Sequence, residues 1–271
     1  MMVQRIDLQT AADLITDNSM IALGGMALYR RPVAFVRALL RRSPPQNLTL
    51  LAFTAGYAAD LMIGTGCVTT IRTVYAGLEV FGFAPMFTVR ASSGELRVQE
   101  ETETSIVLGL RAAAAGVGYL PSLAWQGTDL LDLRLDVHSI TDPYTAEPLT
   151  AFPAINPDVA VIHALAVDAN GNAAINNNLA IDQLLVYASR TVIVTTESFV
   201  DVLRPSGDHT IIPSTGINFI CHAAGGARPT SCFPLYKLEG SVLAGYVEDC
   251  SRDAGFDEHL AAFIGASPDQ P

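Results

Sequence analysis

The chain has 271 residues, half of them apolar, and a formal net charge of -11 at pH 7. This length and apolar content suffice to bury one large core, so we expect a single domain spanning residues 1–271. The acidic balance argues against nucleic acid as a partner, because binding to a phosphate backbone depends on basic surface.

Short apolar runs bounded by Gly, Pro or Asn alternate with amphipathic stretches, which predicts an α/β fold with a mostly parallel sheet flanked by helices. In chain order, the predicted elements are helix 7–16, strand 20–24, helix 33–42, strand 48–53, helix 58–62, strand 68–75, helix 105–115, strand 159–167, helix 179–188 and strand 191–196. The strands lack strict alternation, as expected for strands covered on both faces. The turn-rich segment 125–153 is predicted to be a loop.

The remaining composition points to a cytoplasmic protein without membrane association. The four cysteines form no C-x-x-C pair, which predicts free, buried thiols in a reducing compartment. The first twelve residues carry Arg5, Asp7 and Gln9 where a signal peptide needs an unbroken apolar run. No segment approaches the roughly 18 apolar residues of a membrane span.

Three acids, Glu100, Glu101 and Glu103, precede the nearly uncharged segment 104–121. Acids beside an apolar helix are expected to be partly desolvated, where carboxyl pKa values can move, so Glu101 and Glu103 are candidate catalytic residues. The alternative is structural, because acids near the start of a helix satisfy free N–H groups and favour the positive end of its dipole.

Two glycine-containing segments are candidate ligand sites. Gly24 and Gly25 follow a predicted strand, where a glycine pair either lets backbone approach a ligand or simply ends the strand. The segment 225–236 is too irregular for helix or strand, and ordered irregular backbone often lines a site. Five arginines follow the Gly24-Gly25 pair, and two interpretations of them are open. They form either a solvated helix face or a site for an anionic ligand or acidic partner. These arginines are Arg30, Arg31, Arg37, Arg41 and Arg42.

The histidines predict no metal site, because all five stand singly without the spacing of metal ligands. His163 lies inside the predicted strand 159–167 and fits a hydrogen-bonded core residue. The standard motifs of P-loop hydrolases, serine hydrolases, zinc proteases and dinucleotide enzymes are also missing.

Short motifs in a fixed order resemble the alpha subunit of the family I coenzyme A transferases, in the branch of the A-type subunit of glutaconate CoA-transferase. The motifs are Gly24-Gly25 with Pro32, residues 109–116 with Leu120-Pro121 and 127–129, residues 157–163 with Asp168 and Gly171-Asn172, residues 188–195, and residues 225–227 with 229–236. Together they span about residues 20 to 240, most of the chain.

This resemblance implies the CoA-transferase (NagB/RpiA-like) fold and a homologous beta subunit, usually in an α2β2 assembly. Family enzymes move CoA from an acyl-CoA to a carboxylic acid by ping-pong chemistry through a glutamyl-CoA thioester. The nucleophilic glutamate normally lies on the beta subunit, in a Ser-Glu-Asn-Gly or Glu-x-Gly-x-x-Gly setting, and neither pattern occurs here. The resemblance therefore implies no permanently bound cofactor, with a CoA thioester as substrate.

For this chain the resemblance implies a substrate-binding role rather than the nucleophile. It would shape the acyl pocket and supply backbone donors near Gly24 and Gly25. The other candidate substrate-binding residues are Arg111, Gly225, Gly226 and Ser231.

Two alternatives are open. Some relatives of this branch are hydrolases that cleave a ring carbon–carbon bond in a cyclic 3-oxoacyl-CoA, with an alpha-chain glutamate as base. Here Glu101 or Glu103 would be that base. Those relatives usually begin the segment with two acids, an aromatic residue and Ser, whereas this chain reads Glu100-Glu101-Thr102-Glu103. The second alternative is a non-catalytic chain that binds an acyl-CoA. The acyl group, the acceptor acid and the identity of the beta chain stay open.

Overall fold

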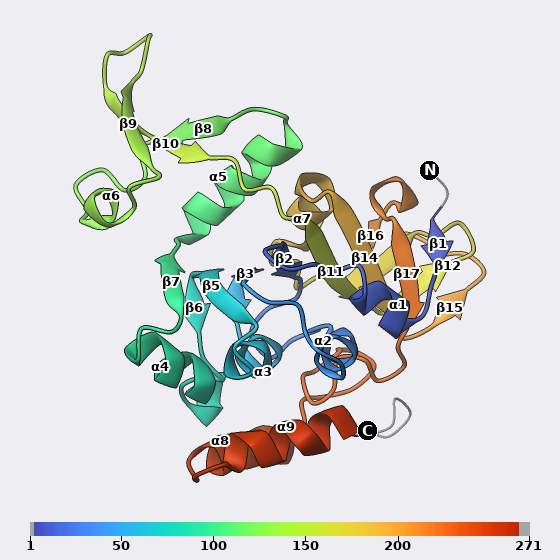
Figure 1. The fold of residues 1–271 in the computed structure, drawn as a ribbon. Coiled ribbons are helices and arrows are strands. Elements are labelled where there is room, and N and C mark those ends of the chain that lie inside the picture. The colour runs from blue at the N-terminus through green and yellow to red at the C-terminus, as the bar shows by residue number, and fades with distance from the viewer. Residues whose placement is uncertain (1–2, 266–271) are drawn as a thin grey trace.

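The computed structural model describes residues 3–265, and its centre is one eight-stranded sheet (Figure 1). The strand order is β1-β17-β14-β11-β2-β3-β5-β7, and every neighbouring pair is parallel. The strands are β1 (Gln4–Arg5), β2 (Met20–Leu23), β3 (Leu48–Ala52), β5 (Val68–Thr73), β7 (Arg97–Glu100), β11 (Val159–Ala164), β14 (Thr191–Thr196) and β17 (Phe219–His222). The predicted α/β class with a mostly parallel sheet is confirmed.

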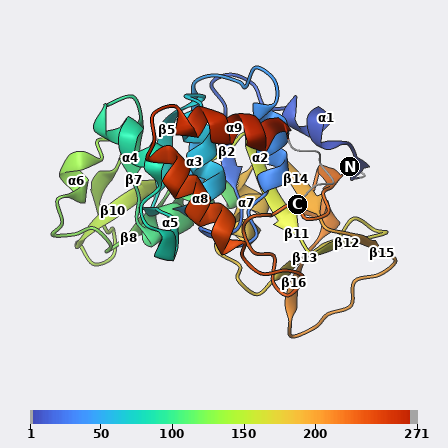
Figure 2. The same ribbon diagram turned by 90° about the horizontal axis from the view of Figure 1, so that it is seen from below.

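Helices cover both faces of this sheet. The helices are α1 (Leu8–Ala12), α2 (Val33–Leu40), α3 (Tyr57–Gly64), α4 (Pro85–Ser92), α5 (Glu103–Ala114), α6 (Leu130–Leu133), α7 (Asp182–Ala188), α8 (Gly240–Cys250) and α9 (Gly255–Gly265). On one face α1, α2 and α3 pack on the strands, with α8 and α9 lying across them as an outer layer (Figure 2). On the other face α5 and α7 pack against each other and the sheet.

The strand residues alternate between these two cores. In β11, Val161 joins the core beneath α2 and α3, whereas Ala160 and Ile162 join the core beneath α5 and α7. Successive side chains of a strand point to opposite faces, and both faces are dry here. This is why the strands read as continuous apolar runs in the sequence.

The segment 125–153, predicted to be a loop, is folded. It contains α6, β9 (His138–Thr141) and β10 (Pro148–Pro153), and β10 pairs antiparallel with both β9 and β8 (Tyr119–Ser122). Trp125 meets Phe152 edge to face, with ring centroids 5.0 Å apart, and forms a small core of its own. This projecting unit, residues 119–153, is called the arm below (Figure 1).

The predicted strand 159–167 is two strands in different sheets. β11 ends at Ala164, and β12 (Ala166–Asp168) joins a four-stranded sheet in the order β15-β12-β13-β16. The other short elements are β13 (Ala173–Asn176), β15 (Phe199–Val200), β16 (His209–Ile212), the pair β4 (Thr54–Ala55) and β6 (Tyr75–Ala76), and the 3-10 turns η1 (Glu79–Phe81) and η2 (Ser214–Gly216). The apolar run continues through the break, so the sequence pattern alone hides it.

Helix boundaries differ most where polar residues follow the apolar stretch. The predicted helix 7–16 is only Leu8–Ala12, with Asp7 as N-cap accepting the Thr10 N–H at 2.8 Å. The predicted helix 179–188 begins at Asp182. The four cysteines are free, as predicted, although Cys250 is only partly buried. No helix within residues 3–265 has the length and apolar character needed to cross a bilayer.

A buried carboxylate joins the outer helices to the core. Asp60 in α3 accepts the N–H groups of Met86 and Phe87, at 3.1 and 2.7 Å, and so caps α4 from another helix. It also accepts the Tyr246 hydroxyl of α8 at 2.6 Å. Burial raises the pKa of Asp60 to about 6, against the lowering effect of these hydrogen bonds. One acid thus links three helices.

Candidate functional site

The candidate residues gather at the carboxyl edge of the parallel sheet, where α/β proteins commonly bind ligands. Gly24 follows β2, Glu101 follows β7 and Glu197 follows β14. The strand order places β7 five strands from β14, which corresponds to roughly 24 Å at the usual strand spacing. The edge therefore carries two separate groups of polar residues, one around Glu101 and one around Glu197.

Glu101 is held between two arginines. It is only 3% exposed, and its Oε1 accepts the Nε and Nη2 of Arg72 in β5 at 2.8 and 2.6 Å. On its Oε2 side, Nη1 of Arg134 from the arm lies 3.1 Å away and the Ser105 hydroxyl donates at 2.5 Å. The two guanidinium groups compensate its charge and occupy the lone pairs that a base or nucleophile would need.

Glu103 lies in a different environment, exposed as the first residue of α5. The N-cap is Thr102, whose hydroxyl accepts the Ser105 N–H at 3.2 Å, while the Ser105 hydroxyl accepts the Thr102 N–H at 2.8 Å. Neither glutamate caps the helix with its side chain, although an acid at this position favours the helix dipole. Arg111, in the last turn of α5, is also exposed.

Glu197 was not singled out from the sequence, yet it organises the second group. Its carboxylate accepts the Tyr236 hydroxyl at 2.5 Å and the N–H groups of Gly225 and Gly226 at 2.7 and 3.1 Å. Its Oε1 lies 2.7 Å from Nε2 of His163 in β11. The predicted ligand-lining glycines are therefore fixed by a carboxylate that follows a neighbouring strand.

The ionisation of the His163–Glu197 pair follows from these contacts. Burial lowers the pKa of His163, and the neighbouring carboxylate opposes that effect only in part. Burial acts to raise the pKa of Glu197, but its hydrogen bonds outweigh burial and hold that pKa below its ordinary value. The pair is a glutamate anion beside a neutral imidazole. His163 is thus the hydrogen-bonded core residue predicted from the sequence.

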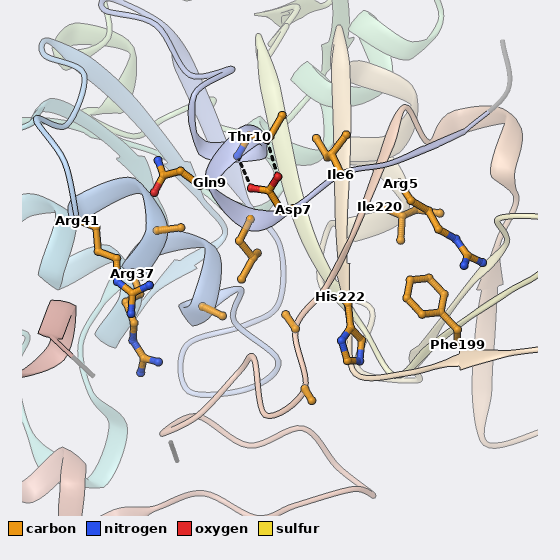
Figure 3. Close-up of a pocket in the computed structure, with 15 residues that line it drawn as sticks. Arg5, Ile6, Asp7, Gln9, Thr10, Arg37, Arg41, Phe199, Ile220 and His222 are labelled. Carbon is orange, nitrogen blue, oxygen red and sulfur yellow. Dashed lines mark hydrogen bonds between the residues drawn. The ribbon is translucent and has the colours of Figure 1, made fainter. Parts of the chain in front are cut away.

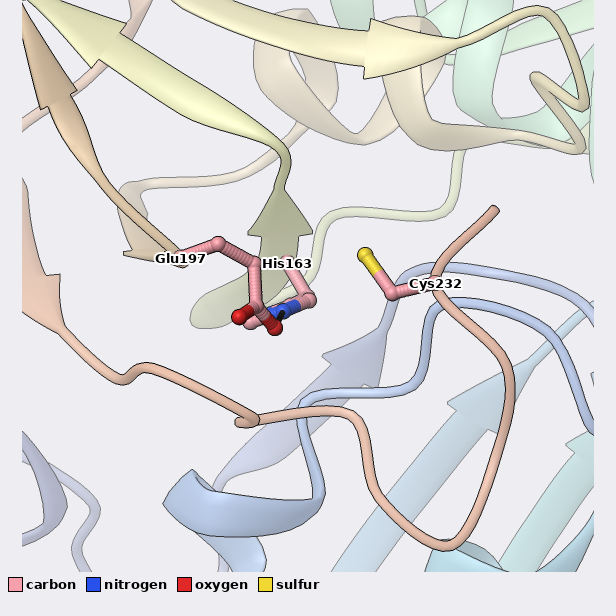
Figure 4. A group of neighbouring side chains, drawn as sticks. All are labelled: His163, Glu197 and Cys232. Carbon is pink, nitrogen blue, oxygen red and sulfur yellow. Dashed lines mark hydrogen bonds and ion pairs between the residues drawn. The ribbon is translucent and has the colours of Figure 1, made fainter. Parts of the chain in front are cut away.

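Cys232 completes a triad with His163 and Glu197, and one ligand atom from each lies within 4.8 Å of the other two (Figure 4). Both imidazole nitrogens already have partners, because Nδ1 lies 2.8 Å from the Thr195 hydroxyl. Burial raises the pKa of the Cys232 thiol to about 12, which favours the protonated thiol over the thiolate that binds metals. The imidazole nitrogens and the carboxylate oxygens of this triad already have hydrogen-bond partners.

The glycine pair packs against another buried ion pair. The Gly25 N–H donates to Asp182 Oδ1 at 2.8 Å, and a Cβ on Gly24 would lie 2.6 Å from the same oxygen. The Gly24 N–H donates to the Val161 carbonyl at 2.8 Å. Both N–H groups already have acceptors inside the protein. What the pair provides is a close approach of backbone.

Neither interpretation of the arginine run fits Arg30 and Arg31, which are each 1% exposed. Arg30 pairs with Asp182 and also donates to the carbonyl oxygens of His163 and Asn178, both at 2.9 Å. Arg31 donates to carbonyl oxygens including those of residues 23 and 24, at 3.0 and 2.8 Å. Because their guanidinium groups hold the carboxyl edge together from within, they face neither solvent nor ligand.

Ser231 is buried beside this group and acts through its backbone. Its N–H donates to the Leu28 carbonyl at 3.0 Å, and its carbonyl accepts the Arg30 N–H at 2.6 Å. The structure thus brings Gly225, Gly226 and Ser231 into the segments around the Glu197 and Asp182 clusters. Glu101, Glu103 and Arg111 lie apart from them, at or along α5.

Comparisons with known proteins agree with this architecture. The family model described as Coenzyme A transferase matches residues 5–223. The A-type subunit of 3-oxoadipate CoA-transferase from Pseudomonas knackmussii is 27% identical over 96% of this chain and 94% of its own length. The cholesterol ring-cleaving hydrolase IpdA subunit of Rhodococcus jostii is 29% identical over 98% of this chain and 93% of its own length.

A solved structure, glutaconate coenzyme A-transferase from Acidaminococcus fermentans, superposes with a TM-score of 0.88 at 26% identity, covering 96% of this chain and 88% of that one. This likeness agrees with the fold expected from the motifs. The chain also resembles a longer protein of Archaeoglobus fulgidus. The two are 28% identical over 94% of this chain, and this chain spans only 58% of the length of that protein.

Proposed function

Because the chain belongs to the coenzyme A transferase family, we propose that it is the alpha subunit of an enzyme that moves CoA between an acyl-CoA and a carboxylic acid. The observation that carries this proposal is the family match over residues 5–223, together with near full-length similarity to the corresponding subunits of two CoA-transferases. The proposed partner is a homologous beta subunit, in an α2β2 assembly. The proposed location is the cytoplasm, with a CoA thioester as substrate and no permanently bound cofactor.

We place the nucleophilic glutamate on the beta subunit. Nucleophilic attack on a thioester needs a carboxylate with a free lone pair and room for the acyl carbon. Glu101 is enclosed by Arg72 and Arg134, and Glu197 accepts several hydrogen bonds. These contacts support a division of labour in which this chain carries no transferase nucleophile.

The proposed contribution of this chain is one wall of the acyl site. The segment beginning at Gly225 and Gly226 is irregular, and Glu197 fixes it through two backbone hydrogen bonds. Ordered backbone of this kind keeps its shape when substrate arrives, so little binding energy is spent on ordering it. Glu197 is in this proposal a positioning residue that acts through the glycines.

The test is co-expression with a candidate beta subunit, followed by incubation with a panel of acyl-CoAs with and without acetate or succinate. Mass spectrometry follows free CoA and each acyl-CoA. The proposal expects a new acyl-CoA only when an acceptor acid is present, and it expects this transfer to persist in Glu103→Gln. Glu100→Gln, at an exposed neighbouring position, is the matched control. Transfer by the alpha chain alone would contradict a nucleophile on the partner.

A ring-cleaving hydrolase is the second candidate, favoured by the similarity to the IpdA subunit and by the exposure of Glu103. Glu103 has the access that a general base requires, whereas Glu101 is enclosed. This candidate expects consumption of a cyclic 3-oxoacyl-CoA by water alone, lost in Glu103→Gln and retained in Glu100→Gln. Binding of acyl-CoA without any turnover would instead identify a non-catalytic chain.

A further inference from the structure

A pocket of about 790 Å³ opens next to the Glu197 group, between β1, α1, α2 and the end of β17 (Figure 3). Its apolar lining includes Ala34, Ala38 and Ile220. Ala223 and Ala224 in its wall directly precede the glycines fixed by Glu197. The volume lies within the range of small-molecule sites, roughly 300–1,000 Å³.

The lining of this pocket is positively charged, although the chain as a whole carries a net charge of -11. Arg5 and Arg37 contribute to it, and Arg41, which donates its Nε to the Ile264 carbonyl, stands beside them; Asp7 is the one acidic residue among those lining the pocket. That carboxylate accepts the N–H and the hydroxyl of Thr10, at 2.8 and 2.7 Å, and so serves as the cap of α1. A local excess of cations on an acidic protein attracts anions.

Arg37 has no carboxylate partner among the described residues 3–265. It is half-buried, its Nε is shielded from solvent without a hydrogen-bond partner, and its guanidinium lies 4.8 Å from the centre of the Phe263 ring. Burial lowers its pKa, the nearby Tyr57 opposes this, and the like charge of Arg41 adds to it. A partly desolvated cation without a counter-ion is costly, and an arriving anion would remove that cost.

Elsewhere in the pocket, Arg5 stacks its guanidinium 4.0 Å from the centre of the Phe199 ring and forms no ion pair within the described part of the chain. The exposed imidazole of His222 lies beside the same ring, with centroids 5.7 Å apart and planes tilted by 31°. Figure 3 shows Arg37 on one side of the cavity and Arg5 beside Phe199 on the other, with His222 between them. The lining therefore offers guanidinium groups, flat rings and an alanine-rich wall.

We propose that this pocket binds an organic anion whose phosphate or carboxylate groups meet Arg37 and Arg5 while its apolar or planar portion lies against the alanines and His222. Guanidinium groups bind both kinds of anion with paired N–H donors. The inference goes beyond the proposed transfer reaction and does not depend on it, because it concerns binding to residues outside the Glu101 and Glu197 groups.

Isothermal titration calorimetry on the full-length chain, co-purified with its partner subunit, tests the inference. The probes are ADP, pyrophosphate, citrate and adenosine, which separate phosphate, carboxylate and planar contributions. We expect saturable binding of ADP or citrate, weaker binding of pyrophosphate and no binding of adenosine. Preference for ADP identifies a phosphate-bearing ligand, and preference for citrate identifies a carboxylate.

The variants Arg37→Gln and Arg5→Gln should each weaken binding of the preferred anion by about 10- to 100-fold, the effect of losing one charge-assisted contact. Arg190→Gln, which removes a guanidinium that is 78% exposed outside the pocket, should leave binding unchanged. Circular dichroism checks that each variant is folded. If Arg37→Gln does not fold, Arg37→Lys and Arg5→Gln carry the test.

Two results would overturn the proposal. The first is the absence of saturable binding of any of the anions at millimolar concentration. The second is binding that persists unchanged in folded Arg37 and Arg5 variants, which would place the site on the partner subunit or elsewhere on this chain. Neither result bears on whether the assembled enzyme transfers CoA, so the two proposals fail separately.

Discussion

Replacing Asp182 by Asn should destabilise the protein strongly, because it breaks a buried ion pair from one side. The Asp182 side chain is fully buried and that of Arg30 is 1% exposed. The substitution leaves the Arg30 guanidinium buried without its counter-charge. It also replaces one carboxylate oxygen by an NH2 group, so the side chain can no longer accept from both the Gly25 N–H and the Arg30 guanidinium.

The expected cost is about 3 kcal/mol, at the lower end of the roughly 3–5 kcal/mol for removing one partner of a buried pair. The lower end applies because Arg30 keeps the carbonyl oxygens of His163 and Asn178, both at 2.9 Å. A typical domain is stable by only about 5–15 kcal/mol, so this loss is a large share of the total.

Urea unfolding followed by circular dichroism measures the effect. With a slope of about 3 kcal/mol per molar urea, the midpoint should fall by about 1 M. Asp13→Asn is the matched control, since Asp13 pairs with Arg42 at 3.8 Å on the surface, and it should cost less than about 1 kcal/mol. Equal midpoint shifts for the two variants would refute the assignment of Arg30 and Asp182 as a structural pair.

Three further predictions concern other described contacts. Burial raises the pKa of Asp60 from 3.8 to about 6, so its contribution to stability is complete below pH 3.8 and is lost as the pH rises through 6. Relative to Asp60→Asn, the free energy of unfolding should fall by about 3 kcal/mol over that interval, measured as urea midpoints at a series of pH values. Tyr236→Phe removes the hydroxyl that accepts the Ala227 N–H at 3.0 Å and donates to Glu197. It should lower the free energy of unfolding by about 1–3 kcal/mol in the same assay, and a change near zero would show that water replaces the hydroxyl. Gly25→Ala should lower the melting temperature sharply, because Gly25 has a φ of 75° and a Cβ there would lie 2.5 Å from two carbonyl oxygens; an unchanged melting temperature would mean that this turn rearranges freely.

The parts of the fold predicted well are those that local pattern decides. The strand 191–196 is found with its exact bounds, because an apolar run between polar residues is enough to define a strand buried on both faces. The sequence pattern does not predict the arm as a folded unit, because its strands are short and the segment is rich in turn residues. What stabilises the arm is a separate cluster around Trp125 and Phe152. The break after Ala164 was missed because apolar residues continue through it.

The site was harder to predict because its contacts join distant segments. Glu101 was flagged by its neighbours in sequence, but its enclosure depends on Arg72 and Arg134, which come from β5 and the arm. Arg30 looked like part of a surface run until folding brought Asp182 against it. Glu197 carried no local signal except its position after a predicted parallel strand, which marks the carboxyl edge of the sheet.

Because Arg134 lies in the arm, Glu101 links the arm to the central sheet. One guanidinium reaches the carboxylate from the central sheet and the other from the arm, and Arg134 also donates to the Glu100 carbonyl at 2.6 Å. The charge of a single side chain is thereby coupled to the orientation of the arm, residues 119–153. Glu101→Gln will weaken this link between the arm and the sheet as well as remove a carboxylate. Arg134→Met weakens the same link and leaves the acid in place. It therefore separates the effect of arm orientation from the effect of losing the carboxylate.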